Sequence, residues 1–163
     1  MNIYTAGHSL SSIEQFIELL SRHDIEVVVD VRSKPRSRLA HFDQAPLQDA
    51  VEAAGMTYRF VGDRLGGVPR DPRVQARWKQ GRLDPAIVAH LRSTDEWSDG
   101  ISEVSRLVRA GRNLCLVCSE ADAAECHRSA VALDAAEATG ATVTHLRVSG
   151  VGPTEVGVQE VMM

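Results

Sequence analysis

Residues 25–31 (IEVVVDV) decide the fold class of this chain, because five of the seven are apolar and β-branched. Such a nearly continuous run is typical of a strand whose two faces are both buried in a parallel sheet. A second run, residues 114–118 (LCLVC), predicts another buried strand in the second half of the chain. Three shorter candidates bring the predicted sheet to five strands: residues 2–6, 56–60 and 142–147.

Helices are predicted between these strands, because apolar residues recur there at spacings of three or four. The first helix is expected to begin at a capping box formed by Ser11 and Glu14. The last, which is alanine-rich, is expected over residues 123–139, with Asp122 as its cap and Gly140 as its stop. Two others are expected at about residues 46–54 and 97–111. Alternating strands and helices form right-handed βαβ units. The pattern therefore predicts a single α/β domain of three layers, with a mostly parallel five-stranded sheet and helices on both faces in a Rossmann-like arrangement.

Length and local composition predict how the chain is organised. Its 163 residues suffice for one ordinary domain, which we expect at residues 1–150. Residues 61–95 break the pattern, because glycine, proline and charged residues replace apolar periodicity, and they predict an irregular, lid-like insertion over a site. Residues 151–163 are expected to form a C-terminal tail that is either loose or an edge strand.

Charge disfavours several classes of protein. The chain has 18 basic and 22 acidic residues, a net charge of −4, and no basic run. A generic nucleic-acid coat or a membrane-surface binder needs a basic excess, so neither is favoured. Only Lys34 and Lys79 are lysines, and the other basic residues are arginines. Codon usage explains such a bias, but the planar fork of arginine also suits phosphate and carboxylate recognition.

The first residues and the cysteines predict the compartment. The chain begins without the basic and apolar regions of a secretory signal, and no apolar run approaches the roughly 20 residues of a membrane helix. Three cysteines, an odd number, favour free thiols over a disulfide framework. We therefore expect a reduced, cytoplasmic protein with no membrane partner.

Polar residues follow three of the predicted strands. These are Gly7-His8-Ser9, Asp30-Val31-Arg32 and Cys118-Ser119-Glu120. In open parallel sheets, ligands bind beyond the carboxyl ends of the strands. The sequence thus predicts one cleft that is lined by these polar residues together with Arg128.

The sulfur-containing motif is Cys118-x-Glu120-x5-Cys126-His127-Arg128. We expect Cys118 to be a nucleophile or redox thiol, because it lies where its strand emerges and because a helix start and nearby cations lower a thiol pKa. His8 or His127 is the candidate acid–base group, and Glu120 or Asp30 would orient it. Cys115 is expected in the core. Cys126 shares a helical face with Ala130 and Leu133, so packing is its favoured role.

Zinc is the alternative for the same motif. Cys118, Cys126 and His127 offer soft ligands, and His8 would be a fourth from another loop. Structural zinc sites use compact C-x2-4-C pairs, which the spacing between Cys118 and Cys126 does not match. No metal and no other cofactor is therefore predicted.

A second group of residues suits an anion. Arg32, Ser37 and Arg38 follow a buried strand, with Pro35 stiffening the loop, and would bind a phosphate or carboxylate. Arg128 and Ser9 would add donors, and Gly66 and Gly67 would let the backbone approach the ligand closely. In the alternative interpretation, Asp30 only pairs with Arg32 or caps loop amides.

Four motifs, in this order, resemble the family of domains of unknown function DUF488. They are T-x-G-H-S at 5–9, D-V-R-S-x-P-x-S-R at 30–38, L-G-G at 65–67 and C-x-E-x5-C-H-R at 118–128. The resemblance implies a bacterial or archaeal α/β protein whose polar motifs cluster, and it implies no established reaction.

Three hypotheses for function follow. The first is a small enzyme that binds an anionic substrate, either a phosphorylated metabolite or a nucleotide, as its small-molecule partner. The second is a non-catalytic module that binds nucleic acid or a partner protein with the same arginines. The third is a metal-binding protein or a thiol sensor.

Overall fold

The computed structural model describes residues 1–149 and 155–161, and it has one sheet with the strand order β3-β2-β4-β1-β5-β6. Five strands are parallel and match the five predicted from the sequence: β1 (Asn2–Gly7), β2 (Val27–Asp30), β3 (Thr57–Phe60), β4 (Leu114–Cys118) and β5 (Thr142–Ser149). The sixth, β6 (Glu155–Val161), pairs antiparallel with β5. Part of the tail expected at 151–163 is therefore an edge strand, whereas its residues 151–154, 162 and 163 lie outside the described residues.

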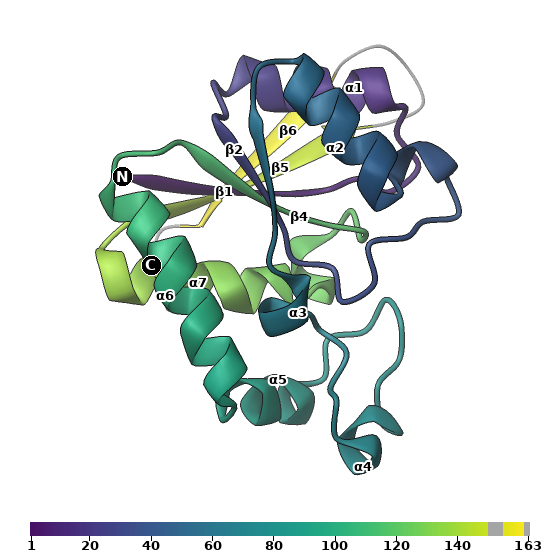
Figure 1. Ribbon diagram of the computed structural model, residues 1–163, viewed down its shortest axis with the longest axis vertical. Coiled ribbons are helices and arrows are strands. Elements are labelled where there is room, and N and C mark those ends of the chain that lie inside the picture. Colours follow the sequence, from purple (N-terminus) through teal and green to yellow (C-terminus); the bar gives the residue numbers. More distant parts are fainter. Residues whose placement is uncertain (150–154, 162–163) are drawn as a thin grey trace.

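Helices cover both faces of the sheet, as predicted. The pair α1 (Ile13–Arg22) and α2 (Gln44–Ala53) lies on one side, above the strands in Figure 1, and the pair α6 (Asp95–Arg109) and α7 (Arg128–Thr139) lies below them. The chain runs from β1 past β4 to β2 and β3, then returns through β4 and past β1 to β5. Because βαβ crossovers are right-handed, this reversal of direction places the later helices on the opposite face. The result is the predicted three-layer α/β fold of Rossmann-like type.

The same reversal brings β4 between β1 and β2. The carboxyl ends of these three strands are therefore neighbours. The three polar motifs that follow the strands thus begin at the same edge of the sheet.

Two helix starts differ from the sequence-based expectation. The capping box of α1 is formed by Ser12 and Gln15, because the Ser11 hydroxyl instead donates to the carbonyl of His8 (2.6 Å). Asp122 caps only a short 3-10 turn, η2 (Ala123–Glu125). The backbone is then extended at Cys126, and α7 begins at Arg128. Its stop is Gly140, in the left-handed conformation (φ 74°), as predicted.

Alternation along the strands divides the core in two. Val27 and Val29 of β2 face α6 and α7, whereas Val28 faces α1 and α2. The same alternation sends Cys115 of β4 toward α1 and α2, and Cys118 toward α7. Cys115 is fully buried, in agreement with the core role expected for it.

Residues 61–95 hold three short helices, α3 (Gly62–Leu65), α4 (Pro72–Gln75) and α5 (Pro85–Arg92), as well as the loops between them. In Figure 1, α4 and α5 lie at the lower end of the molecule, beyond α3. A further 3-10 turn, η1 (Ala40–Phe42), precedes α2. In the described part of the chain, no helix combines the length and the apolar character that crossing a membrane requires.

Candidate functional site

The polar residues at the strand ends divide between the two faces of the sheet. Asp30 pairs in register with Val117, so its side chain lies on the face of α1 and α2, and Cys118 points to the opposite face. His8 follows Ala6 on the same face as Asp30. The one cleft expected for all of them is therefore divided: His8 and Asp30 lie on the face of α1 and α2, whereas Arg32, Cys118 and Glu120 line one pocket, which is described below.

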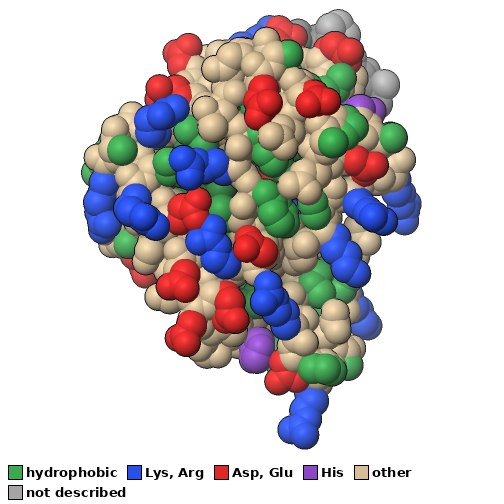
Figure 2. Space-filling model, in the orientation of Figure 1, with side chains coloured by type: hydrophobic (Ala, Val, Ile, Leu, Met, Phe, Trp, Pro, Cys, Tyr) green, Lys and Arg blue, Asp and Glu red, His purple; other side chains and the backbone are tan. Residues whose placement is uncertain are grey.

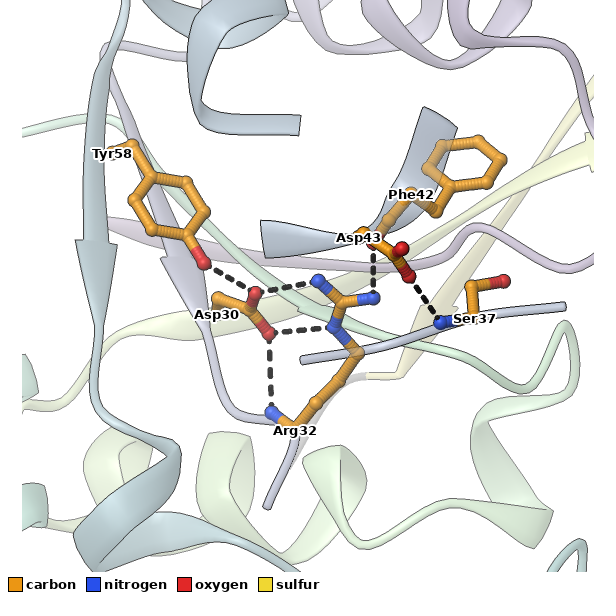
Figure 3. A network of polar contacts seen from close by, with 6 residues as sticks. All are labelled: Asp30, Arg32, Ser37, Phe42, Asp43 and Tyr58. Carbon is orange, nitrogen blue, oxygen red and sulfur yellow. Dashed lines mark hydrogen bonds and ion pairs between the residues drawn. The ribbon is translucent and has the colours of Figure 1, made fainter. Parts of the chain in front are cut away.

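Asp30 and Arg32 form a closed network on the α1 and α2 side (Figure 3). The Arg32 guanidinium donates to both Asp30 carboxylate oxygens (2.9 and 2.8 Å) and to the carbonyl of Phe42 (2.6 Å). The Tyr58 hydroxyl donates to Asp30 Oδ2 at 2.5 Å. Burial and the adjacent Asp30 charge raise the pKa of Tyr58. Asp30 is 0% and Arg32 3% exposed, so the charged side chains hold the β2 end together, as in the alternative interpretation, and are not free for a ligand.

His8 lies beside this network rather than beside the cysteines. Its ring stacks on Phe42, with centroids 4.3 Å apart, and its Nδ1–H donates to the carbonyl of Ser9 (3.0 Å). Its Nε2 is buried and has no hydrogen-bond partner among the described residues. Burial lowers the pKa of His8 to about 4, so the ring is neutral near pH 7. Ser9 adopts a left-handed conformation (φ 46°), and its N–H donates to Ser119.

Ser37, an expected anion ligand in the loop after β2, instead forms hydrogen bonds with its own chain. The N–H of Ser37 donates to Asp43 (2.8 Å), and the Ser37 hydroxyl accepts from Leu39 (3.1 Å). Arg38 is exposed but does not line the pocket described below. Two neighbours in the same loop do line it, Lys34 and Arg36.

A cluster of two thiols and an imidazole lies on the α7 side. Nδ1 of His127 is 3.9 Å from the Sγ atoms of both Cys118 and Cys126, and Cys118 Sγ is 3.6 Å from Glu120 Oε2. His127 Nε2 is 2.9 Å from the carbonyl of Val31, which can only accept a hydrogen bond. Nε2 therefore carries a proton, and Nδ1 is the atom that exchanges a proton with the thiols.

Two features of the backbone hold this cluster in place. A Cβ at Gly67 would lie 2.7 Å from Nδ1 of His127, so only glycine lets the 65–67 loop pack on the imidazole. A Cβ at Gly7 would lie 1.6 Å from the carbonyl oxygen of Glu120, so the end of β1 also needs glycine where the loop after β4 crosses it. Gly66 packs against Ser33 in the same way. The glycines expected near a ligand thus serve close packing of the chain, and Gly67 lines the pocket as well.

The neighbours of the two thiols distinguish them. Contact with the Cys118 thiol places the pKa of Cys126 well below its ordinary value, and His127 and Arg128 lower it further. Contact with Cys126, burial and the Glu120 charge raise the pKa of Cys118, whose thiol donates to Glu120 Oε2 (3.6 Å). Burial lowers the pKa of His127, but hydrogen bonding to Cys126 and the Cys126 charge outweigh it and raise the pKa. Burial and the same charge raise the pKa of Glu120. The cluster thus favours a Cys126 thiolate beside a His127 imidazolium.

Arg128 connects the segments of chain that surround the cluster. It is fully buried, and its guanidinium donates to the carbonyls of Glu120 (2.6 Å) and Ala121 (3.1 Å) and to the hydroxyl of Thr5 (3.2 Å). Arg128 therefore joins α7 to β1 and to the loop after β4, and it is not open to the anion expected there.

A pocket of about 380 Å³ lies over the cluster. Cys118, Glu120, Cys126 and His127 line it together with apolar side chains of α5 and with the loops that follow β2 and α4. Arg32, whose charge is paired with Asp30, lines it too, and so do four further cationic residues: Lys34, Arg36, Lys79 and Arg82. In residues 1–149 none of the four has an ion-pair partner, whereas the lining Asp84 pairs with Arg77 (3.5 Å).

Sequence reasoning missed part of this site. The sequence pattern predicts a packing role for Cys126, and it does not indicate the pocket positions of Arg36, Trp78, Lys79 and Arg82. One signal was present, since both lysines of the chain line this pocket. The role of Cys126 beside Cys118 depends on the extended backbone before α7, which leaves no pattern in the sequence.

The same trio has the composition of a soft-metal site. Sγ of Cys118, Sγ of Cys126 and a nitrogen of His127 lie within 4.8 Å of one another, and they form the one such group found in the described part of the chain. The sulfur-to-nitrogen distances of 3.9 Å exceed the roughly 3.6 Å that follows from tetrahedral zinc bond lengths. His8 lies on the other face of the sheet and does not complete the set.

A family model described as "Domain of unknown function DUF488" matches residues 12–133. The chain belongs to the DUF488 family. The DUF488 match includes three of the four motifs, from D-V-R-S-x-P-x-S-R to C-x-E-x5-C-H-R, and begins after T-x-G-H-S. The comparisons with curated proteins and with solved structures gave no match. Because the DUF488 description names no reaction, the function is argued from the site.

Proposed function

We propose that this DUF488 protein is an enzyme that binds a small anionic molecule in the pocket and attacks it with Cys126, assisted by His127. The observation that carries the proposal is the position of the Cys118–Cys126–His127 cluster in a pocket with four unpaired cations. A cationic pocket attracts an anion, and a thiolate beside an imidazolium is the nucleophile used by many thiol enzymes.

Each residue of the cluster has a role in this chemistry. Sγ of Cys126 forms a bond to an electrophilic atom of the substrate while the bond from that atom to its leaving group breaks. Nδ1–H of His127 protonates the leaving group. The same Nδ1 then takes a proton from a water or another acceptor, whose oxygen displaces Cys126 and releases the product. Cys118 lies beside Cys126, lowers the pKa of its thiol and is a positioning residue.

Nucleic-acid binding by the same cations is the alternative function, and the charge distribution argues against it. Acidic and basic side chains are mixed over the face of the molecule in Figure 2 instead of forming one basic stripe. The net charge of −4 points the same way.

Alkylation of the native protein with iodoacetamide, mapped by mass spectrometry of its peptides, tests the proposal. We expect Cys126 to react fastest, Cys115 not to react, and inorganic phosphate to slow the reaction at Cys126. Cys115 is a matched internal control, because it lies on the same strand as Cys118 but faces the closed core.

Two results would overturn the proposal. One is that all three thiols are inert. The other is that the purified protein contains one equivalent of zinc whose removal unfolds it, which would make the trio a structural metal site. Tight binding of a single-stranded oligonucleotide that weakens steeply with salt, without protection of Cys126 by inorganic phosphate, would favour the nucleic-acid function instead.

A further inference from the structure

The pocket has two chemically different walls, and this difference bears on the class of substrate. One wall is cationic and comes from the loop after β2 (Lys34 and Arg36) and the loop before α5 (Lys79 and Arg82). The other wall is apolar and comes from α5, whose lining side chains are at most 7% exposed: Ile87, Val88 and Leu91. A simple inorganic anion would use only the first wall.

Trp78 extends the apolar wall toward the cations. It is partly buried against the core on the α6 and α7 side, and it comes directly before Lys79 in the chain. No hydrogen bond to its indole N–H is present among the described residues, whereas the other tryptophan, Trp97, donates its N–H to Asp134 (2.8 Å). The ring of Trp78 lines the pocket and offers a flat surface on which another ring can stack.

Charge and size limit the ligand further. The four unpaired cations outnumber the lining carboxylates of Asp84, Glu120 and Glu125, and a phosphate offers them more acceptor oxygens than a single carboxylate does. A volume of about 380 Å³ is near the lower end for small-molecule pockets and too small for a polymer.

We propose that the substrate is a compact phosphate ester that carries an aromatic ring. The phosphate binds Lys34, Arg36, Lys79 and Arg82, and the ring lies against Trp78 and α5. This inference rests on the proposed function, because it assumes that the pocket above Cys126 is the substrate site.

Titration calorimetry with phenyl phosphate and methyl phosphate tests the inference, since the two probes share the phosphate and differ in the ring. We expect phenyl phosphate to bind at least about tenfold more tightly, as ring stacking predicts. Trp78→Ala should reduce the affinity for phenyl phosphate to that for methyl phosphate, and Trp78→Phe should keep most of the preference. Lys34→Ala should weaken both probes by a similar factor. Arg38→Ala is the matched control, because Arg38 belongs to the same loop but does not line the pocket, and it should change neither.

The inference is overturned if methyl phosphate binds as tightly as phenyl phosphate, if Trp78→Ala weakens both equally, or if neither probe binds. Iodoacetamide alkylation of Cys126 in the presence of each probe separates this inference from the proposed function. Equal binding of the two probes, with protection of Cys126 by both, would refute the aromatic substrate and leave the thiol chemistry standing. Preferential binding of phenyl phosphate without protection of Cys126 would refute the thiol chemistry and leave the ligand class standing.

Discussion

At the scale of single residues, two cysteines eight positions apart have pKa values shifted in opposite directions. Cys118 and Cys126 are 4% and 2% exposed, so their difference does not come from contact with water. It comes from their neighbours: each thiol acts on the other, the Glu120 charge raises the pKa of Cys118, and His127 and Arg128 lower that of Cys126. The nucleophile expected at Cys118 is therefore better placed at Cys126.

This arrangement predicts how alkylation of Cys126 depends on pH. A thiolate exists above the pKa, so a lowered pKa keeps Cys126 reactive at pH values where an ordinary cysteine is protonated. Cys118→Ala removes the neighbouring thiol that lowers the pKa of Cys126, so it should raise that pKa and slow the alkylation of Cys126 at pH 7. Cys118→Ser keeps a polar hydroxyl at this position and should keep more of the rate. Rates measured for the three proteins from pH 5 to 10 check this, and identical pH profiles would contradict this role of Cys118.

His8 predicts a loss of stability in mild acid. Its pKa is lowered to about 4 in the native protein, against about 6.5 in the unfolded chain. Between these values the unfolded chain binds a proton that the native protein does not, so the free energy of unfolding falls as the pH falls through this range. The full effect is about 3 kcal/mol. Urea unfolding at pH 7 and pH 4 should show a smaller decrease for His8→Gln than for the wild type, and equal decreases would refute this account of His8.

At the scale of elements, the end of β2 is held by a buried ion pair whose carboxylate, that of Asp30, lies on the face of α1 and α2. Asp30 and Arg32 satisfy each other, and Tyr58 of the neighbouring strand β3 donates to the same carboxylate. These contacts hold the C-terminal end of β2 in a fixed position. The carbonyl of Val31, one residue beyond β2, accepts the hydrogen bond that orients His127. The network thus fixes the backbone that orients His127.

The position of this network predicts that its loss affects stability much more than thiol reactivity. Asp30→Ala leaves the Arg32 charge buried without a partner and should lower the free energy of unfolding by about 3–5 kcal/mol. Tyr58→Phe removes one hydrogen bond to a charged group and should cost about 1.5–3 kcal/mol. Chemical unfolding measures both.

Tyr58→Phe is the informative variant for the site, because it is expected to fold. Its Cys126 should be alkylated at the wild-type rate, since Tyr58 lies on the face of α1 and α2. A large change in that rate, with folding intact, would mean that the network takes part in the chemistry.

At the scale of the whole molecule, the reversal of strand order creates the site. The insertion of β4 between β1 and β2 brings three strand ends together, and residues 61–95, which connect β3 to α6, supply the far wall of the pocket. The irregular composition of 61–95 predicted a segment over a site, and its side chains line the pocket above the cysteines. A connection with ordinary helical periodicity would have packed against the sheet along its whole length.

The sequence by itself determined the strands, the helices and the fold class, because these depend on local patterns. The runs at 25–31 and 114–118 had to be buried on both faces, and alternation with helices leaves few arrangements of such strands. The sequence also located the C-x-E-x5-C-H-R motif, which contains the three members of the cluster.

Only the tertiary structure decided which polar residues meet. Adjacent side chains on a strand point to opposite faces, so the pairing of Asp30 with Val117 sends Cys118 to the face opposite Asp30, although both lie at neighbouring strand ends. Whether a cationic side chain is free depends on its surroundings in space: Arg32 and Arg128 donate to buried protein oxygens, whereas Lys34 and Arg36 have no ion-pair partner in residues 1–149. Burial and hydrogen-bond partners are properties of contacts between distant segments, and no local pattern in the sequence encodes them.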